Sequence, residues 1–336
     1  MSSFNASRWL PGGHSQTLYS PLFRSELPLA RERERLTLRD GDFLDLDWYG
    51  RCDNDTPCII LLHGLTGSSS SRYILGQQKA LALKGWQSVA VNWRGCSGEP
   101  NRLARGYHSG VSEDLAEVID VLSARRPAQP LAAVGYSLGG NVLLKYLGEQ
   151  GGASPLKAAA AVSVPFRLEH SAERIRQGMS KIYQARFLRE LRHYMADKRQ
   201  RFAIHGDPDE YAKLLSLGSL KRITTLWEFD ERVTAPLHGF SSAAEYYQRC
   251  SSLYFLSSIN VPTLIILAQD DPFLYPESSP DPQSLPSHVA LEFHHQGGHV
   301  GFIEGTPWSP DYYLERRLPT WLASTLSNAD RWASCA

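Results

Sequence analysis

The sequence predicts an α/β fold: a mostly parallel, doubly wound sheet with an N-terminal antiparallel hairpin and an inserted helical cap. Three observations indicate this fold class. Short continuous apolar runs are typical of strands buried on both faces, amphipathic segments with helical spacing separate them, and one long stretch interrupts the alternation. With 336 residues, of which 42% are hydrophobic, the chain can bury a large core.

The expected elements follow one another in a regular order. Two alternating segments, 34–40 and 42–50, meet at Asp40-Gly41, which is a hairpin signal. Further strands are expected at 58–64, 87–95, 131–137, 157–166, 261–273 and 288–299. Helices are expected at 70–84, at 114–126 with Ser112 as its cap, directly after 137, and at 312–326, interrupted or begun at Pro319.

The alternation stops over 170–205, where apolar residues recur at helical spacing without a strand between them: Ile175, Met179, Ile182, Phe187, Leu191 and Met195. Residues 171–205 hold nine Lys and Arg against three Asp and Glu. Two interpretations are open. The segment is a helix packed on the core with a solvated basic face, or a cap whose apolar side covers a pocket and whose basic side meets anionic headgroups or coenzyme A.

This interruption defines the expected domain organisation. Residues 1–30 form an N-terminal arm, 31–166 together with 251–336 form the core, and 167–250 form the helical cap insertion.

Composition excludes several classes of protein. Lys and Arg balance Asp and Glu at 35 each, which is not the composition of a nucleic-acid-binding chain. Five scattered cysteines show neither a disulfide pattern nor zinc-ligand spacing, so we expect no metal. The N-terminus lacks the pattern of a signal peptide and no apolar stretch is long enough to span a membrane. We expect a cytoplasmic protein, with peripheral lipid contact through the cap as one option.

The string GYSLGG, residues 135–140, is the strongest local signal of chemistry. It follows a predicted buried strand and opens a predicted helix, which is the arrangement that a nucleophile elbow requires. The glycines leave room for a strained turn that exposes the Ser137 hydroxyl, and the helix directs its positive end at a developing oxyanion. Ser137 is therefore the expected nucleophile.

A serine hydroxyl needs a base, and after such an elbow the acid and then the histidine follow in chain order. Asp270 and Asp271 end the strand at 261–273, and we prefer Asp271 because a short residue and an apolar one follow it. The other aspartate is expected to accept backbone amides of the turn. Of His294, His295 and His299, only His299 lies behind two glycines in a loop, so it is the expected base. Those glycines also argue against a helical zinc site at His295 and His299.

HGLTG, residues 63–67, belongs to the loop that supplies a second oxyanion donor. We expect the backbone amides of Leu65 and Leu138 to hold the oxyanion, with His63 shaping the turn. His14, in GGHSQTL near the N-terminus, precedes the whole sheet, where the chain order offers no place for a base. We expect GGHSQTL to pack an N-terminal arm near the mouth of the site.

Together these strings resemble the α/β-hydrolase fold. GGHSQTL, HGLTGSSSS, NWRGCSGEPNR with YHSG, GYSLGGN, DDPF and GGHVGF, in that order, are similar to the YheT-type hydrolases, a family of predicted esterases. Its relatives include yeast medium-chain ethanol acyltransferases and animal membrane-anchored phospholipases. The resemblance covers residues 9–325 and implies that the charge-relay serine, acid and histidine match Ser137, Asp271 and His299.

We therefore expect a serine hydrolase that cleaves short- to medium-chain acyl esters, with monoacylglycerols among them, through an acyl-enzyme on Ser137 and without a cofactor. Transfer of the acyl group from acyl-CoA to an alcohol is one alternative, since it shares the acyl-enzyme. A catalytically silent protein of this fold that binds a ligand is another.

Overall fold

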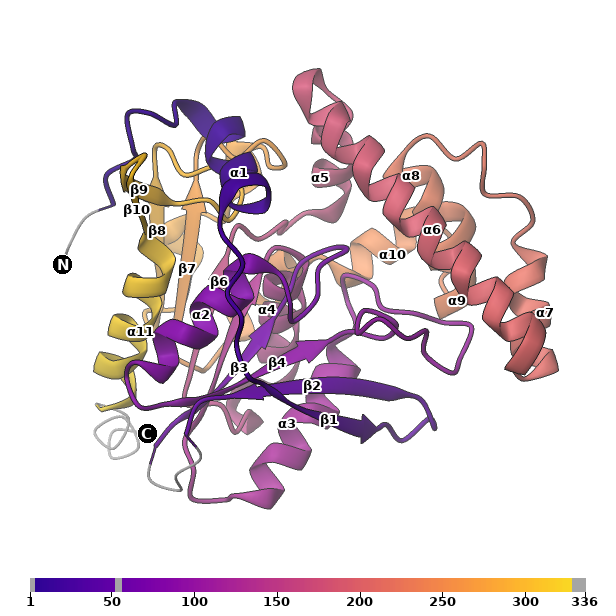
Figure 1. Cartoon of the computed structure of the whole chain (residues 1–336), viewed down its shortest axis with the longest axis horizontal. Coiled ribbons are helices and arrows are strands. Elements are labelled where there is room, and N and C mark those ends of the chain that lie inside the picture. The colour runs from indigo at the N-terminus through magenta and orange to yellow at the C-terminus, as the bar shows by residue number, and fades with distance from the viewer. Residues whose placement is uncertain (1–3, 52–55, 328–336) are drawn as a thin grey trace.

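The computed structural model describes residues 4–51 and 56–327; two of the five cysteines, Cys52 and Cys335, lie outside the described residues. Eight strands form one sheet in the order β1-β2-β4-β3-β5-β6-β7-β8 (Figure 1). Their bounds are β1 (Glu32–Thr37), β2 (Phe43–Tyr49), β3 (Cys58–Leu62), β4 (Gln87–Asn92), β5 (Leu131–Tyr136), β6 (Ala158–Val162), β7 (Thr263–Ala268) and β8 (Val289–His294).

The sheet is antiparallel only at the edge that its first two strands, β1 and β2, form. β1 pairs with β2 and β2 with β4 in antiparallel fashion, and every other pair of neighbours is parallel. The register places Leu62 opposite Gly135 and Tyr136 opposite Val162. The carboxyl ends of β3, β5 and β6 therefore meet at one edge, where the following loops are brought together.

Helices cover both faces of the sheet, as the predicted doubly wound fold requires. The elements are α2 (Arg72–Ala82) and α11 (Tyr313–Leu326) on one face and α3 (Ser112–Arg125) and α4 (Leu138–Gln150) on the other. β3, β5 and β6 are almost entirely apolar because they are buried from both sides, and β4 is buried as well although polar residues stand at both of its ends.

Two local predictions about these helices are wrong. α3 begins at Ser112 itself, and the Ser112 hydroxyl donates to Glu149 instead of capping the helix. α11 begins six residues before Pro319 and continues through it, so the proline neither starts nor interrupts the helix.

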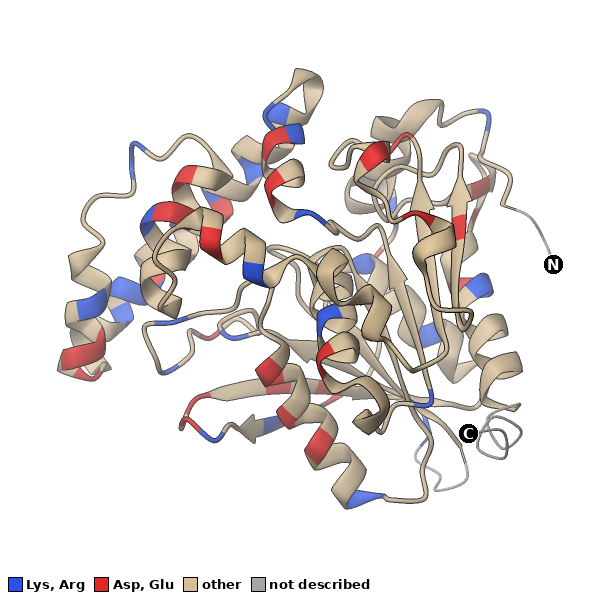
Figure 2. Cartoon of the chain, turned by 180° about the vertical axis from the view of Figure 1, so that it is seen from behind, with Lys and Arg blue, Asp and Glu red and all other residues tan. Residues whose placement is uncertain are grey.

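The segment predicted as the cap, residues 167–250, contains α5 (Leu168–Arg174), α6 (Lys181–His205), α7 (Pro208–Ser216), α8 (Leu226–Phe229), a π-helical turn (Asp230–Thr234), α9 (Ala235–His238) and α10 (Ala243–Cys250). Figure 1 shows these helices set to one side of the sheet. They have an apolar cluster of their own, which includes Leu188, Leu214 and Ile223. Figure 2 shows both signs of charge along the cap, and ion pairs such as Arg186–Glu190 and Arg201–Asp197 join them.

The predicted apolar stripe on this segment is only partly right. Leu191 and Met195 are buried, but Met179 and Ile182 are 59% and 66% exposed. A 3₁₀ turn at Gly178–Ser180 separates α5 from α6 and changes the phase of the helix, so that Tyr183 is buried in place of Ile182.

The predicted N-terminal arm contains a helix, α1 (Gly12–Phe23). The remaining elements are short: the hairpin of β9 (Ile303–Thr306) and β10 (Ser309–Tyr312), and the 3₁₀ turns Gly151–Ala153, Ser252–Ser258, Pro276–Ser278 and Pro282–Ser284. Within the described residues no helix is both long and apolar enough to cross a membrane.

Candidate active site

Ser137 occupies a strained turn between β5 and α4. Its φ of 53° and ψ of −119° lie in a region that non-glycine residues rarely adopt. The turn is possible because the flanking glycines lack side chains: a Cβ at Gly135 would meet the Gly139 carbonyl oxygen at 2.4 Å, and one at Gly139 would meet that of Leu62 at 2.5 Å. This is the local geometry that the GYSLGG string predicts.

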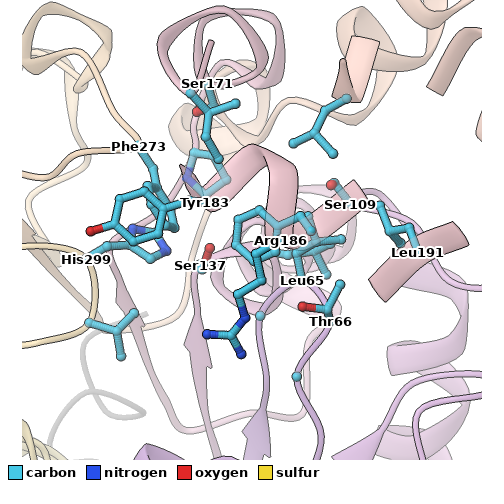
Figure 3. Close-up of a pocket in the computed structure, with 18 of the residues that line it drawn as sticks. Leu65, Thr66, Ser109, Ser137, Ser171, Tyr183, Arg186, Leu191, Phe273 and His299 are labelled. Carbon is cyan, nitrogen blue, oxygen red and sulfur yellow. The ribbon is translucent and has the colours of Figure 1, made fainter. Parts of the chain in front are cut away.

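His299 is oriented by a carboxylate. Its Nδ1 lies 2.8 Å from Oδ2 of Asp271, and since a carboxylate only accepts, Nδ1–H is the donor. Asp271 is 3% exposed, and its other oxygen accepts the N–H of Phe273 at 2.8 Å. Ser137 and His299 line the same cavity (Figure 3), and with Nδ1 engaged the imidazole has Nε2 left for a proton from serine.

Asp270 has a different partner. Its Oδ1 accepts the backbone N–H of Gly298 at 2.9 Å, in the loop that carries His299. Asp271 therefore makes the hydrogen bond to His299. Asp270 accepts a backbone amide, but the prediction that this amide belongs to its own turn is wrong, because the donor is Gly298 of the histidine loop.

Two residues that the sequence did not single out hold the next two amides of that loop. The His299 N–H donates to Oγ1 of Thr17 at 2.8 Å, and the Val300 N–H donates to Oγ of Ser163 at 3.0 Å. Thr17 comes from α1 and Ser163 directly follows β6. Thr17 lies within GGHSQTL, so that string gave a signal for its importance; nothing in the sequence distinguished Ser163. The three consecutive amides of Gly298, His299 and Val300 therefore each donate to a side chain, and the three side chains come from distant segments of the chain.

Two backbone N–H groups beside Ser137 have no hydrogen-bond partner in the described part of the chain: those of Leu65 and Leu138. The N–H groups on either side of Leu65, from Gly64 and Thr66, donate to tyrosine hydroxyls at 3.0 and 2.9 Å. Leu138 is the first residue of α4, so its N–H has no partner within the helix. Both residues line the cavity, and their amides are available to an anionic oxygen.

His63 is buried beneath this loop. Its Nδ1–H donates to the Gly64 carbonyl oxygen, and its Nε2 accepts the Trp93 N–H. Burial lowers the pKa of His63 to about 4, so the ring is neutral at pH 7. The expectation that His63 shapes the turn is consistent with these contacts.

The other candidate histidines face elsewhere. His14 on α1 lies with its Nδ1 3.1 Å from the hydroxyl of Tyr183 on α6, with the two rings parallel. His294 ends β8, and His295 pairs with Gln269; neither lines the cavity. GGHSQTL does lie at the site, through Thr17 and Leu18.

The cavity has a volume of about 430 Å³ and lies between the core, α1 and the cap. Much of its wall is apolar: Leu18, Pro21, Leu168, Ile175, Phe187 and Leu191. The apolar side of α6 thus covers a pocket, as the second interpretation of this segment expects, while contact of its basic side with anionic headgroups or coenzyme A stays a prediction. No group of three or more His, Cys, Asp or Glu that could hold a metal occurs among residues 4–51 and 56–327.

Comparison with known proteins identifies the family. The family model described as "alpha/beta hydrolase fold" matches residues 57–306. The chain is 40% identical to "Putative esterase YheT" of Escherichia coli, over 97% of this chain and 94% of that protein. It is 30% identical to human "Phospholipase ABHD3" over 92% of this chain and 75% of that protein, and 30% identical to yeast "Monoacylglycerol lipase" over 75% and 56%.

Solved structures show the same fold at low sequence identity. An esterase from Pyrococcus furiosus matches with a TM-score of 0.54 and 16% identity, over 89% of this chain and 91% of that one. Mouse alpha/beta hydrolase domain-containing protein 10 matches with a TM-score of 0.53 and 13% identity, over 88% and 99%.

Proposed function

This chain belongs to the α/β-hydrolase family, and we propose that it hydrolyses carboxylic esters through an acyl-enzyme on Ser137. The observation that carries the proposal is the shared cavity of Ser137 and His299, with Asp271 hydrogen-bonded to the far side of the imidazole. A related esterase and related lipases agree with this chemistry.

The reaction follows from the positions of these groups. Nε2 of His299 takes the proton of the Ser137 hydroxyl as its oxygen attacks the acyl carbonyl, while Asp271 stabilises the imidazolium. The Leu65 and Leu138 amides donate to the tetrahedral oxyanion. His299 then protonates the leaving alcohol, and a water molecule activated by the same imidazole releases the acid and restores Ser137.

The substrate class that we propose is short- to medium-chain acyl esters, monoacylglycerols included. A cavity of about 430 Å³ with an apolar wall suits an acyl chain of that size. One relative is named as a monoacylglycerol lipase and another as a phospholipase, and both names support a lipid ester as the substrate.

Hydrolysis of p-nitrophenyl esters from acetate to palmitate tests the proposal. We expect the highest kcat/KM between butyrate and decanoate and no enzymatic turnover by Ser137→Ala. Turnover that survives in Ser137→Ala would refute the acyl-enzyme, and folded wild-type protein that cleaves none of these esters would support a binding role. Formation of ethyl octanoate from octanoyl-CoA and ethanol, in excess over octanoate, would identify acyl transfer as the main reaction.

A further inference from the structure

One part of the cavity wall is polar and takes no part in the proposed mechanism. It consists of Ser109, Asp230, Thr234, Tyr246 and Tyr247, all of which line the cavity. They come from three segments: the loop before α3, the π-helical turn of the cap, and α10. Figure 3 shows Ser109 on the opposite side of Ser137 from His299. We call these five residues the polar wall.

Hydrogen bonds join the members of the polar wall to one another. Asp230 accepts the Tyr247 hydroxyl through Oδ2 and the Thr234 hydroxyl through Oδ1, both at 2.7 Å. The Tyr246 hydroxyl accepts the Ser109 N–H at 2.9 Å, and the Tyr246 and Tyr247 rings pack 5.2 Å apart. Each Asp230 oxygen receives one bond and has acceptor capacity left.

Asp230 has no cationic partner. Among the described residues no Lys, Arg or His nitrogen lies within ion-pair distance of it. Burial raises the pKa of Asp230 to about 6. Asp230 is half-buried, and a carboxylate that loses part of its hydration without gaining a counter-charge costs free energy, so a neutral side chain would serve stability alone better. Titratable groups kept in such an environment within a cavity are candidates for ligand recognition.

The turn that carries Asp230 is itself unusual. Residues Asp230–Thr234 form a π-helical turn, which inserts an extra residue into the helix and is frequent at functional sites. This turn places Asp230 and Thr234, four residues apart, on the cavity wall together. Leu226 and Phe229, just before the turn, are apolar and also line the cavity, so the polar wall borders an apolar part of the cap.

We propose that the polar wall binds a hydroxyl group of the ester substrate, with Asp230 as the acceptor, so that the enzyme prefers esters of polyols such as glycerol to esters of simple alcohols. This inference rests on the proposed function. An ester whose carbonyl lies at Ser137 can direct its apolar acyl chain along the wall of α5 and α6 and its hydroxylated part toward the polar wall. A site that is built to bond a substrate hydroxyl discriminates against an analogue that lacks it.

The test compares two esters that differ only in hydroxyl groups, 1-octanoylglycerol and propyl octanoate, by release of octanoate. For the wild type we expect kcat/KM to favour the glyceryl ester roughly tenfold or more, since a hydrogen bond to a charged group contributes about one to two orders of magnitude. In Asp230→Leu we expect the ratio to fall to about one, and in Asp230→Asn to an intermediate value. Tyr247→Phe should lower the ratio as well.

Glu231→Gln is the matched control. Glu231 neighbours Asp230 in the same turn and accepts the Ala243 N–H at 2.7 Å, but it does not line the cavity. We expect this variant to keep the wild-type ratio. Thermal unfolding separates recognition from structure. A carboxylate that only holds Tyr247 and Thr234 in place would lower Tm in Asp230→Asn and leave the ratio unchanged, whereas recognition requires the ratio to fall in protein that is still folded.

Equal wild-type turnover of both esters would overturn the inference and leave the hydrolase assignment in place. A preference for the glyceryl ester that survives in folded Asp230→Leu would also overturn the inference. If Asp230→Leu does not fold, an unchanged ratio in Asp230→Asn overturns it instead. A preference for octanoylcholine over both esters would mean that Asp230 receives a cation, contrary to the proposal. Turnover of none of these esters would overturn the proposed function together with the inference.

Discussion

Asp270 and Asp271 are adjacent in the chain, yet they accept hydrogen bonds from different kinds of donor. Asp271 accepts the imidazole N–H of His299, and Asp270 accepts the backbone N–H of Gly298. The first bond fixes the tautomer and supports positive charge on the ring, while the second only fixes the backbone.

Replacing each aspartate by asparagine tests this difference. Asp271→Asn should lower kcat about 10³- to 10⁴-fold, because an amide that donates to Nδ1 favours the wrong tautomer. Asp270→Asn keeps an oxygen that can accept the Gly298 N–H, so we expect a loss of less than about tenfold. Esterase kinetics on p-nitrophenyl butyrate measure both, and a larger loss in Asp270→Asn would reverse the assignment.

The sequence could point to this pair because strand order and chain order fix where the acid and the histidine lie. The choice of Asp271 rested on the two residues after it, Pro272 and Phe273. The structure gives a physical reason for that cue, since the Phe273 N–H donates to Asp271 and its ring packs 4.2 Å from that of His299.

At the scale of elements, α1 supports the histidine loop. Thr17 accepts the His299 N–H, and the Gln16 side chain both accepts the Ile303 N–H and donates to the Ile303 carbonyl. The approach is close: a Cβ at Gly13 would meet the Asp270 carbonyl oxygen at 1.8 Å. Gly298 and Gly301 of GGHVGF approach α1 as closely, since a Cβ there would meet the carbonyl oxygens of Gly13 and Gln16 at 2.4 and 2.5 Å.

This contact predicts the effect of changing Thr17. Thr17→Val keeps the volume but leaves the His299 N–H without an acceptor, at a cost of about 1–3 kcal/mol, so we expect kcat to fall roughly tenfold. Thr17→Ser should restore most of it. Ser15→Ala is the control, because its hydroxyl donates only to the carbonyl oxygens of Pro11 and Gly12 at the start of α1. If Thr17→Val and Thr17→Ser have the same kcat, the hydrogen bond from the His299 N–H to Thr17 does not contribute to catalysis.

Pattern analysis could not find α1 because its buried positions are small or polar: Gly13, Gln16, Thr17 and Ser20. The main signal of a helix in a sequence is the recurrence of apolar residues every three or four positions. In α1 hydrogen bonds to the histidine loop take the place of apolar contacts. Met179 and Ile182 were predicted to be buried because the helical spacing was extended across the turn at Gly178–Ser180. The turn changes the phase of the helix, so these positions belong to the exposed face.

The sheet was predictable because its central parallel strands β3, β5, β6 and β7 are buried on both faces and consist almost entirely of apolar residues. The hydrophobic pattern does not predict which polar side chains are buried. Several histidines are among them, and burial keeps their rings neutral. Burial lowers the pKa of His63, His108 and His238.

These histidines predict acid sensitivity of the whole molecule. His63 titrates near 4 when folded and near 6.5 when unfolded, so the unfolded state binds the extra proton between these values. Its contribution to stability is present above pH 6.5 and is lost as the pH falls toward 4. Between pH 7 and 5 the free energy of unfolding should lose about 2 kcal/mol on this account.

Urea unfolding at pH 7 and pH 5 measures this loss. His63→Gln can keep a donor to Gly64 and an acceptor for Trp93 but does not titrate, so its loss between the two pH values should be smaller by about 2 kcal/mol. The same loss in both proteins would show that His63 does not carry the effect.

The most direct test of the central claim, a nucleophilic Ser137 activated by His299, is labelling with a fluorophosphonate followed by peptide mapping. We expect one adduct, on Ser137, in the wild type and in His14→Ala, no adduct in Ser137→Ala, and labelling about 10²-fold slower or more in His299→Ala. An adduct on another residue, or labelling of His299→Ala at the wild-type rate, would contradict the account.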